Sequence, residues 1–200
     1  MALIAETPPD RRWYELNSSL KANQAEVDMR KVTYGAAVSL DGYIAGPGDA
    51  MDWLLWSDDA RKISADSWKG VDTMLMGRKT YEFAARSGGG GTSKIKTYIF
   101  SRTMAQAPEG AELVRGDAAG FVRALKTGPG GDIIVMGGGE LGASLIAGGV
   151  VDEVGLNLHP VLLGGGVPMF APIASRVELE LIEARPIARG CVLLLYKAGG

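Results

Sequence analysis

The chain has 200 residues, of which 46% are apolar and 22% charged, the balance of a folded globular protein with about one domain. A net charge of −2 does not favour nucleic acid or an anionic membrane as the partner. One cysteine and one histidine, Cys191 and His159, exclude an internal disulfide and a metal site built from several such residues. With no apolar run near the ~20 residues of a membrane helix and no signal-peptide core, we expect a cytoplasmic protein without metal.

Residues 1–29 differ from the rest of the chain. They are polar, with a Pro-Pro turn and then a stretch that tolerates one weak amphipathic helix. We expect an N-terminal extension without functional residues, either native, left over from cloning or due to a misassigned start. The function is therefore assigned to one domain, residues 30–198.

From residue 31 on, segments typical of strands and helices alternate. Helices are predicted at 57–69, 78–86, 117–128 and 139–147. Strands are predicted at 32–40, 71–76, 94–100, 111–115, 133–136, 151–163, 177–184 and 190–197. The early alternation indicates parallel strands with crossover helices, and the last strands, which have no helix between them, indicate an antiparallel edge. The sequence predicts an α/β fold of about eight strands and four helices.

Glycine makes up 29 of the 200 residues, about twice its average share. The apolar run Ile133–Met136 leads into Gly137–Gly139 and then into a predicted helix. Glycines let backbone N–H groups approach a pyrophosphate, and a helix N-terminus favours an anion. A tight turn without a ligand is the alternative. A classical Rossmann site is disfavoured because the motif comes late and lacks the acidic residue about 20 positions on.

Two further strand ends carry groups that bind anions. The strand 71–76 leads into Gly77–Thr80, and the strand 94–100 leads into Ser101–Arg102. Basic side chains in the first turn of a helix oppose its dipole, which favours a negatively charged partner over a merely solvated turn. Because the carboxyl ends of parallel strands meet at one edge of a sheet, we expect all three segments to form one site.

These segments resemble a known family. Gly77–Glu82 and Val135–Gly139 look like the two cofactor motifs of dihydrofolate reductases, while Val38–Ala45 and Asp152–Gly166 resemble the reductase domain of the riboflavin-pathway deaminase–reductase. The chain thus resembles the stand-alone members of the dihydrofolate-reductase-like superfamily from residue 30 to about residue 198. The resemblance implies a three-layer fold with an eight-stranded, mostly parallel mixed sheet, NADPH as hydride donor, a small heterocyclic substrate and a homodimer.

The resemblance also implies which residues bind the cofactor. The positions similar to those that hold the phosphates are Gly77, Arg78, Lys79 and Thr80, with Ser101 and Arg102 on the side of the adenosine 2′-phosphate. The positions similar to the pyrophosphate and nicotinamide turn are Gly137, Gly138, Gly139, Glu140 and Leu141. The positions similar to the lining of the nicotinamide pocket are Ala37, Ile44 and Ala45.

Two carboxylates are candidate proton donors. Folate reductases carry Met-x-Trp and then an acid five residues after the Trp; here Met51–Trp53 is followed at that spacing by Asp58. Asp41 is the second candidate, because riboflavin-type reductases share Ser-Leu-Asp-Gly. The alternatives are that Asp58 only stabilises a helix N-terminus and that Asp41 only forms an Asp-Gly turn. His159 and Cys191 are expected to be structural.

The leading hypothesis is an NADPH-dependent reductase that transfers hydride to a pterin- or pyrimidine-type heterocycle. Its substrate would resemble dihydrofolate or 5-amino-6-(5-phosphoribosylamino)uracil. The chain lacks a deaminase half and its zinc signature, and it carries Gly-Arg-Lys-Thr-Tyr-Glu where riboflavin-type reductases have an acidic, Pro-containing loop. The alternative is a nucleotide-binding regulatory or scaffold protein that kept the cofactor site without turnover.

Overall fold

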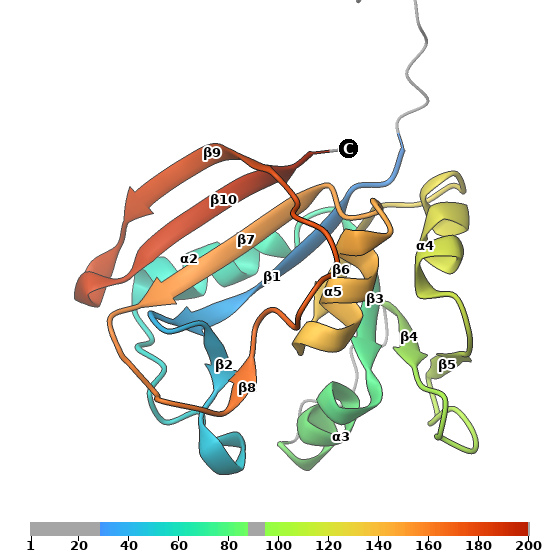
Figure 1. The fold of residues 1–200 in the computed structure, drawn as a ribbon, viewed down its shortest axis with the longest axis horizontal. Helices are drawn as coiled ribbons and strands as arrows, with labels where there is room; N and C mark the ends of the chain where they lie inside the picture. The colour runs from blue at the N-terminus through green and yellow to red at the C-terminus, as the bar shows by residue number, and fades with distance from the viewer. Residues whose placement is uncertain (1–28, 88–94, 200) are drawn as a thin grey trace, which may run out of the picture.

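The computed structural model describes residues 29–87 and 95–199. Its centre is a sheet of eight strands in the order β5-β4-β3-β6-β1-β7-β10-β9 (Figure 1). The strands are β1 Val32–Ser39, β3 Val71–Gly77, β4 Lys96–Phe100, β5 Ala111–Val114, β6 Asp132–Met136, β7 Glu153–His159, β9 Leu179–Pro186 and β10 Val192–Ala198. The pairs from β5 to β7 are parallel, and β10 is antiparallel to both β7 and β9.

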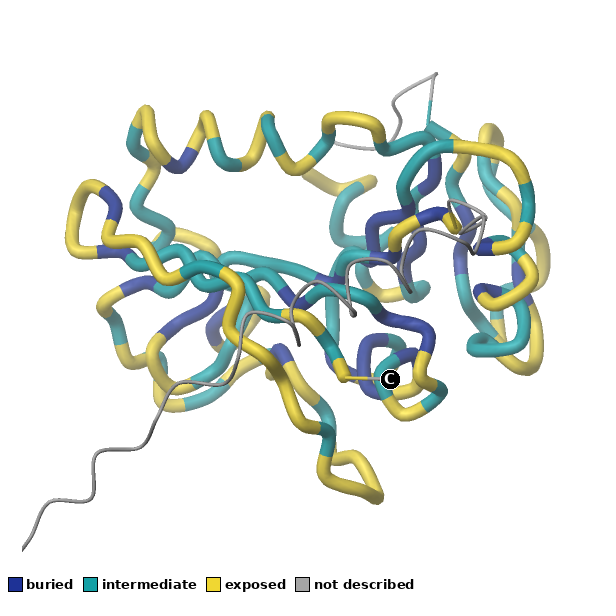
Figure 2. The backbone as a smooth tube through the Cα atoms, turned by 90° about the horizontal axis from the view of Figure 1, so that it is seen from above, coloured by how far each residue is buried: buried dark blue, intermediate teal, exposed yellow. Residues whose placement is uncertain are grey.

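Four α-helices occur in the described ranges. They are α2 Asp58–Ser67, α3 Arg78–Arg86, α4 Ala118–Lys126 and α5 Gly139–Ala147. Two begin at the predicted caps, since Ser57 accepts a hydrogen bond from Ala60 N and Asp117 accepts one from Gly120 N. Helix α2 lies on one side of the sheet, and α4 and α5 lie on the other (Figures 1 and 2). The fold therefore has three layers.

The main core lies between the sheet and the two helices α4 and α5. Val122 of α4 and Leu145 of α5 are completely buried, together with Val32 and Tyr34 of β1. Because side chains alternate along a strand, the odd-numbered residues of β1 face the opposite side, where α2 lies. Of the ten residues of α2 only Ala60 is buried, so this helix covers its side of the sheet loosely.

The predicted α/β fold with its antiparallel C-terminal edge is confirmed. Strand β7 ends at His159 rather than at residue 163, because Pro160 has no N–H for the ladder and the following residues form a glycine-rich loop. The small sheet of β2 Tyr43–Ala45 and β8 Val167–Pro168 was not predicted, since strands of three and two residues show no periodicity. Two short 3-10 helices, η2 Pro47–Asp49 and η3 Ala188–Gly190, also occur in the described ranges. No helix in the described ranges is long and apolar enough to cross a membrane.

A partly buried ion pair joins three elements at the end of the sheet where the parallel strands begin, which we call its amino edge. Lys126 Nζ, at the end of α4, lies 2.5 and 2.7 Å from the two carboxylate oxygens of Asp152, just before β7. The same carboxylate accepts a hydrogen bond from the N–H of Val32 at the start of β1. The side chain of Lys126 is 10% exposed and that of Asp152 is 38% exposed, so solvent screens the pair only from the side of Asp152.

Replacing Lys126 by Met should therefore lower the free energy of unfolding by about 1–3 kcal/mol, because Asp152 keeps its charge and loses its main partner. The matched control is Lys62→Met on α2, which removes an exposed pair with Asp66 and should cost at most about 0.5 kcal/mol. Urea unfolding measures both variants. Equal losses would contradict the assigned role of Lys126.

Candidate functional site

The three predicted anion-binding segments meet where the parallel strands β3, β4 and β6 end, which we call the carboxyl edge of the sheet. Strand β3 lies between β4 and β6, with Gly77 beside Phe100 and Met76 beside Met136. The residues that follow these strand ends are therefore neighbours in space. The structure thus brings together Gly77–Thr80, Ser101–Arg102 and Gly137–Leu141, as the sequence predicted.

Two glycines stand at the starts of helices without any structural need for glycine. Gly77 and Gly138 are the N-cap residues of α3 and α5, with φ of −78° and −72°, which any residue adopts. A Cβ at Gly77 would meet nothing within 4 Å, and one at Gly138 would meet only Val167, at 3.6 Å. Neither residue offers a side-chain cap, so the first N–H groups of both helices remain open to an anion.

The neighbouring glycines, in contrast, are required by the fold. Gly137 has a φ of +94°, and a Cβ there would overlap the side chain of Thr80 at the start of α3. A Cβ at Gly139 would overlap the backbone of Phe170 and Ala171. These two positions let α3 and the segment after β8 close against the turn. In the run Gly137–Gly139, the fold thus requires the first and the third glycine but not the second.

Tyr34 of β1 packs against the Gly137–Gly139 turn and forms hydrogen bonds there. Its hydroxyl lies 3.3 Å from the Gly137 carbonyl oxygen and within hydrogen-bond distance of the Met169 carbonyl oxygen. The ring fits because Gly142 of α5 has no side chain; a Cβ there would overlap it. Burial raises the pKa of Tyr34, which keeps its hydroxyl a donor. This role of Tyr34 could not be predicted from the sequence, because a single Tyr in a strand forms no motif.

Positive side chains lie in the first turn of α3 and in the loop after β4, the strand beside β3. Arg78 pairs with Glu82 one turn on, at 2.7 Å, while Lys79 and Arg102 are exposed and make no ion pair with the described residues. Ser101 Oγ accepts hydrogen bonds from the N–H groups of Thr103 and Met104, which shapes the loop that carries Arg102. The edge therefore offers positive charge beside unpaired N–H groups.

The predicted nicotinamide positions lie next to this edge. Ala37 belongs to β1, and Ile44 and Ala45 belong to β2, with Ala45 buried. Glu140 and Leu141, in the first turn of α5, are exposed and half-buried respectively. The small residues of β1 and β2 thus border the end of the sheet that carries the open helix starts.

The carboxylate of Asp41 links the Asp-Gly turn after β1 to the loop after β7 by hydrogen bonds. Its carboxylate accepts hydrogen bonds from Ser39 Oγ at 2.6 Å, from Gly164 N at 2.7 Å and from Leu163 N at 3.1 Å. Hydrogen bonding from Ser39 above all, and then from the two backbone groups, holds the pKa of Asp41 below its usual value. The ionised form is therefore favoured, and it fastens the Asp-Gly turn to the loop after β7.

Asp58 is the exposed first residue of α2. The segment just before it is fastened to the end of β7, where the N–H of Leu55 donates to His159 Nδ1 at 3.3 Å. The next residue, Asp59, accepts a hydrogen bond from Ala188 N. His159 is 2% exposed, with the Trp53 ring edge-on at 5.2 Å, and burial lowers its pKa. Among Asp41, Asp58 and Asp59, only the Asp58 side chain makes no hydrogen bond with the described residues.

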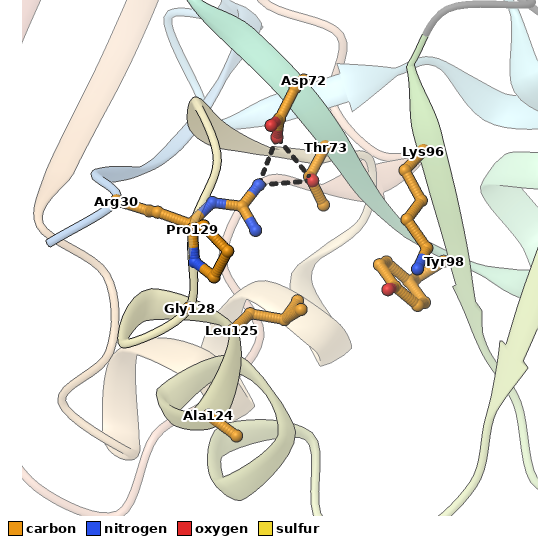
Figure 3. Close-up of a pocket in the computed structure, with 9 residues that line it drawn as sticks. All are labelled: Arg30, Asp72, Thr73, Lys96, Tyr98, Ala124, Leu125, Gly128 and Pro129. Atoms are coloured by element: carbon orange, nitrogen blue, oxygen red, sulfur yellow. Dashed lines mark hydrogen bonds and ion pairs between the residues drawn. The ribbon is translucent and has the colours of Figure 1, made fainter.

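A cavity of about 460 Å³ lies at the opposite, amino edge of the sheet (Figure 3). Its polar wall is Arg30, which hydrogen-bonds to Asp72, Thr73 and the Gly131 carbonyl oxygen. The Arg30 charge is thus compensated within the protein, and none of the predicted site residues lines the cavity. In the described residues there is also no cluster of three metal-ligating side chains.

Comparison with known proteins agrees with this geometry. The family model described as the RibD C-terminal domain matches residues 30–193. YyaP of Bacillus subtilis strain 168, an uncharacterized protein, is 32% identical over 183 residues, which cover 86% of this chain and 96% of YyaP.

Two solved structures show the same fold. A putative riboflavin biosynthesis protein from Shewanella sp. PV-4 superposes with a TM-score of 0.76 at 23% identity, covering 85% of this chain and 99% of that one. The dihydrofolate reductase of Enterococcus faecalis, solved with NADP(H), gives a TM-score of 0.64 at 17% identity, covering 85% and 97%. The chain thus has the dihydrofolate-reductase-like fold.

The two kinds of glycine should respond differently to substitution. Gly137→Ala should cost about 1–3 kcal/mol of folding free energy, because it combines a disfavoured positive φ with overlap on Thr80. Gly138→Ala is the matched control, and it should change stability by no more than about 0.5 kcal/mol. Urea unfolding of the two purified variants is the measurement. A Gly138 variant as unstable as the Gly137 variant would show that the open position is structural too.

Proposed function

We propose, because the chain belongs to the RibD C-terminal domain family, that it is an NADPH-dependent reductase of a pterin- or pyrimidine-type heterocycle. One observation carries the proposal: two helices begin side by side at the carboxyl ends of β3 and β6, each behind a glycine that the fold itself does not require. Open backbone donors in that arrangement suit a ligand with several phosphates.

The residues present fit such a cofactor. The N–H groups behind Gly77 and Gly138 would meet its phosphates, and side chains at these positions would occupy the same space. Lys79 and Arg102 supply exposed positive charge suited to a 2′-phosphate. The small residue Ala37 leaves room beside β1 for a flat ring. When bound, the cofactor supplies the hydride; the protein orients both rings and limits the access of water.

We assign the two carboxylates to different tasks. Asp41 has three hydrogen-bond donors on its carboxylate, which favours the ionised form, so its proposed task is to hold the loop after β7. Asp58 stands at the start of the helix that covers the other face of the sheet and is our candidate proton donor. A carboxyl group there would protonate the heterocycle as it accepts hydride.

A second candidate function is a nucleotide-binding regulatory or scaffold protein without turnover. The observation that favours it is the exposure of Asp58, since a general acid is normally enclosed when the substrate is bound. Oxidation of NADPH, followed at 340 nm with a panel of pterins and pyrimidines, separates the two. NADPH binding without oxidation of any of them would support the second function.

NADPH should bind more tightly than NADH, because the exposed charges at the edge suit a 2′-phosphate. Arg102→Ala should reduce this preference by about 1–3 kcal/mol, the value of a charged hydrogen bond. Gly138→Val should bind neither cofactor, since its side chain would fill the phosphate position. Titration calorimetry measures these affinities, with Arg123→Ala, at an exposed residue of α4, as the matched control. Equal affinity of the unmodified protein for NADPH and NADH would contradict the prediction.

Replacing Asp58 by Asn should leave NADPH affinity unchanged and slow hydride transfer by roughly 10²–10⁴-fold, the usual contribution of a general acid. The residual rate should rise as the pH falls, because substrate that is already protonated needs no acid. Stopped-flow absorbance measures this step.

The control is Asp41→Asn, which should lower the melting temperature by loosening the loop after β7. If Asp41→Asn instead slowed hydride transfer while Asp58→Asn did not, the two assignments would have to be exchanged.

We also propose that the protein forms a homodimer through the β9 edge. Strand β9 ends the sheet, and the apolar side chains Leu179, Leu181 and Ile182 are 42–53% exposed there. Ile182 sits at an irregularity in the pairing with β10. Exposed apolar side chains on an edge strand are a liability unless a partner covers them. A second copy of the chain is the occupant that the resemblance to this superfamily implies.

Ile182→Lys should therefore convert a dimer into a monomer, because it places a charge in an apolar contact. Sedimentation velocity measures the change, with Ile173→Lys as a control at an exposed apolar residue away from the edge strand. A monomeric unmodified protein would refute the proposed interface.

A further inference from the structure

The face of the sheet toward α2 carries half-buried small and polar residues in its middle. Strands β1 and β7 are interior strands with neighbours on both sides. Even so, Gly35 and Ala37 of β1 and Gly155 and Asn157 of β7 are only half-buried. Their neighbours Ala36 and Leu156 pack against the main core, so by alternation these residues face the other side of the sheet, on which α2 lies. Small side chains and a loosely packed helix thus leave this part of the face half-buried, between the buried residues Ser39 and His159.

Asn157 is the polar side chain in the middle of this face. It pairs in register with Ala37 on one side and with Leu193 on the other. Its Oδ1 is enclosed and has no hydrogen-bond partner in the described structure. Buried polar atoms are almost always paired, so an unpaired one requires an explanation.

A second unpaired atom lies on the same face of the same strand. His159 Nε2 is also enclosed and without a partner among the described residues. Its Nδ1 accepts the hydrogen bond from Leu55 N, which places the proton of the neutral imidazole on Nε2. Asn157 and His159, two residues apart on the α2 side of β7, thus carry an unpaired acceptor and an unpaired donor. A core packed only for stability would not keep both.

We propose that Asn157 determines substrate specificity by hydrogen-bonding the amide edge of the heterocycle, a ring N–H next to a ring carbonyl. This inference rests on the proposed function, because it assigns the ring to the face that borders the nicotinamide positions. A carboxamide is complementary to a cyclic amide, since each offers one donor and one acceptor side by side. The terminal torsion of Asn is soft, so the amide turns easily to present both groups.

The geometry agrees with a ring placed there. Ala37, which lies beside Asn157 in the register, is the β1 residue that borders the proposed nicotinamide position. A ring bonded to Asn157 therefore lies next to the position from which hydride would come. Two positions earlier on the same strands, Gly35 and Gly155 carry no side chain; a Cβ at Gly35 would overlap the Gly155 carbonyl oxygen, and the Leu195 side chain lies beside Gly155.

The test combines ring selectivity with thermal stability. The probes are lumazine and its N3-methyl derivative, which lacks one ring N–H; their affinities are measured by calorimetry in the presence of NADPH. The unmodified protein should prefer lumazine, and Asn157→Leu should lose that preference and bind lumazine about 10- to 100-fold more weakly. Asn157→Leu should also raise the melting temperature by about 2–4 °C, because it removes an enclosed polar atom without a partner.

A purely structural Asn157 would give the opposite pair of results, a lower melting temperature with unchanged selectivity, and would overturn the proposal. Thr33→Val, an isosteric change on the same face of β1, is the matched control and should alter neither reading. Asn157→Ala serves if the Leu variant does not fold, with the same expected loss of selectivity. If the proposed function failed but the role of Asn157 held, lumazine would bind selectively and NADPH would not be oxidised. No selectivity in the unmodified protein would overturn the assignment of Asn157.

Discussion

The parallel pairing of β6 with both β1 and β3 is the constraint on which the candidate site depends. The apolar run Ile133–Met136 is almost entirely buried, so β6 fits only in the middle of the sheet. Its pairing with β3 sets the two glycine-ended strands side by side, and its pairing with β1 brings Tyr34 below the turn. A shift of the register by one residue would turn the buried side chains to the wrong face and move Gly137 away from Thr80.

The carboxyl and amino edges of the sheet differ in how their charges are used. At the amino edge, Arg30 is paired with Asp72 and Lys126 with Asp152, so charge joins strands to helices and supports stability. At the carboxyl edge, Arg102 is exposed beside open helix starts. Charges that are already compensated within the protein have little to offer a ligand, and the cavity beside Arg30 contains none of the candidate site residues.

The sheet also separates the two proposed ligands. The cofactor segments lie at the carboxyl ends of β3, β4 and β6, while the half-buried face with Asn157 belongs to β1 and β7. Strand β1 contributes to both, through Tyr34 on the core side and Ala37 on the side of α2. Because side chains alternate along a strand, one strand can hold the cofactor turn and border the substrate at once.

The sequence by itself determined the fold class, the main strands and helices, the caps at Ser57 and Asp117 and the three segments that meet at the carboxyl edge. Those features rest on local patterns: apolar periodicity, capping residues, and glycine after a buried strand. Only the tertiary structure decided which glycines the fold requires and that Asp41 forms a hydrogen bond to the loop at Gly164. The same holds for Asn157, whose Oδ1 has no hydrogen-bond partner among the described residues. These properties depend on residues more than 30 positions apart along the chain. Their contacts follow from strand order and register, which local patterns do not encode.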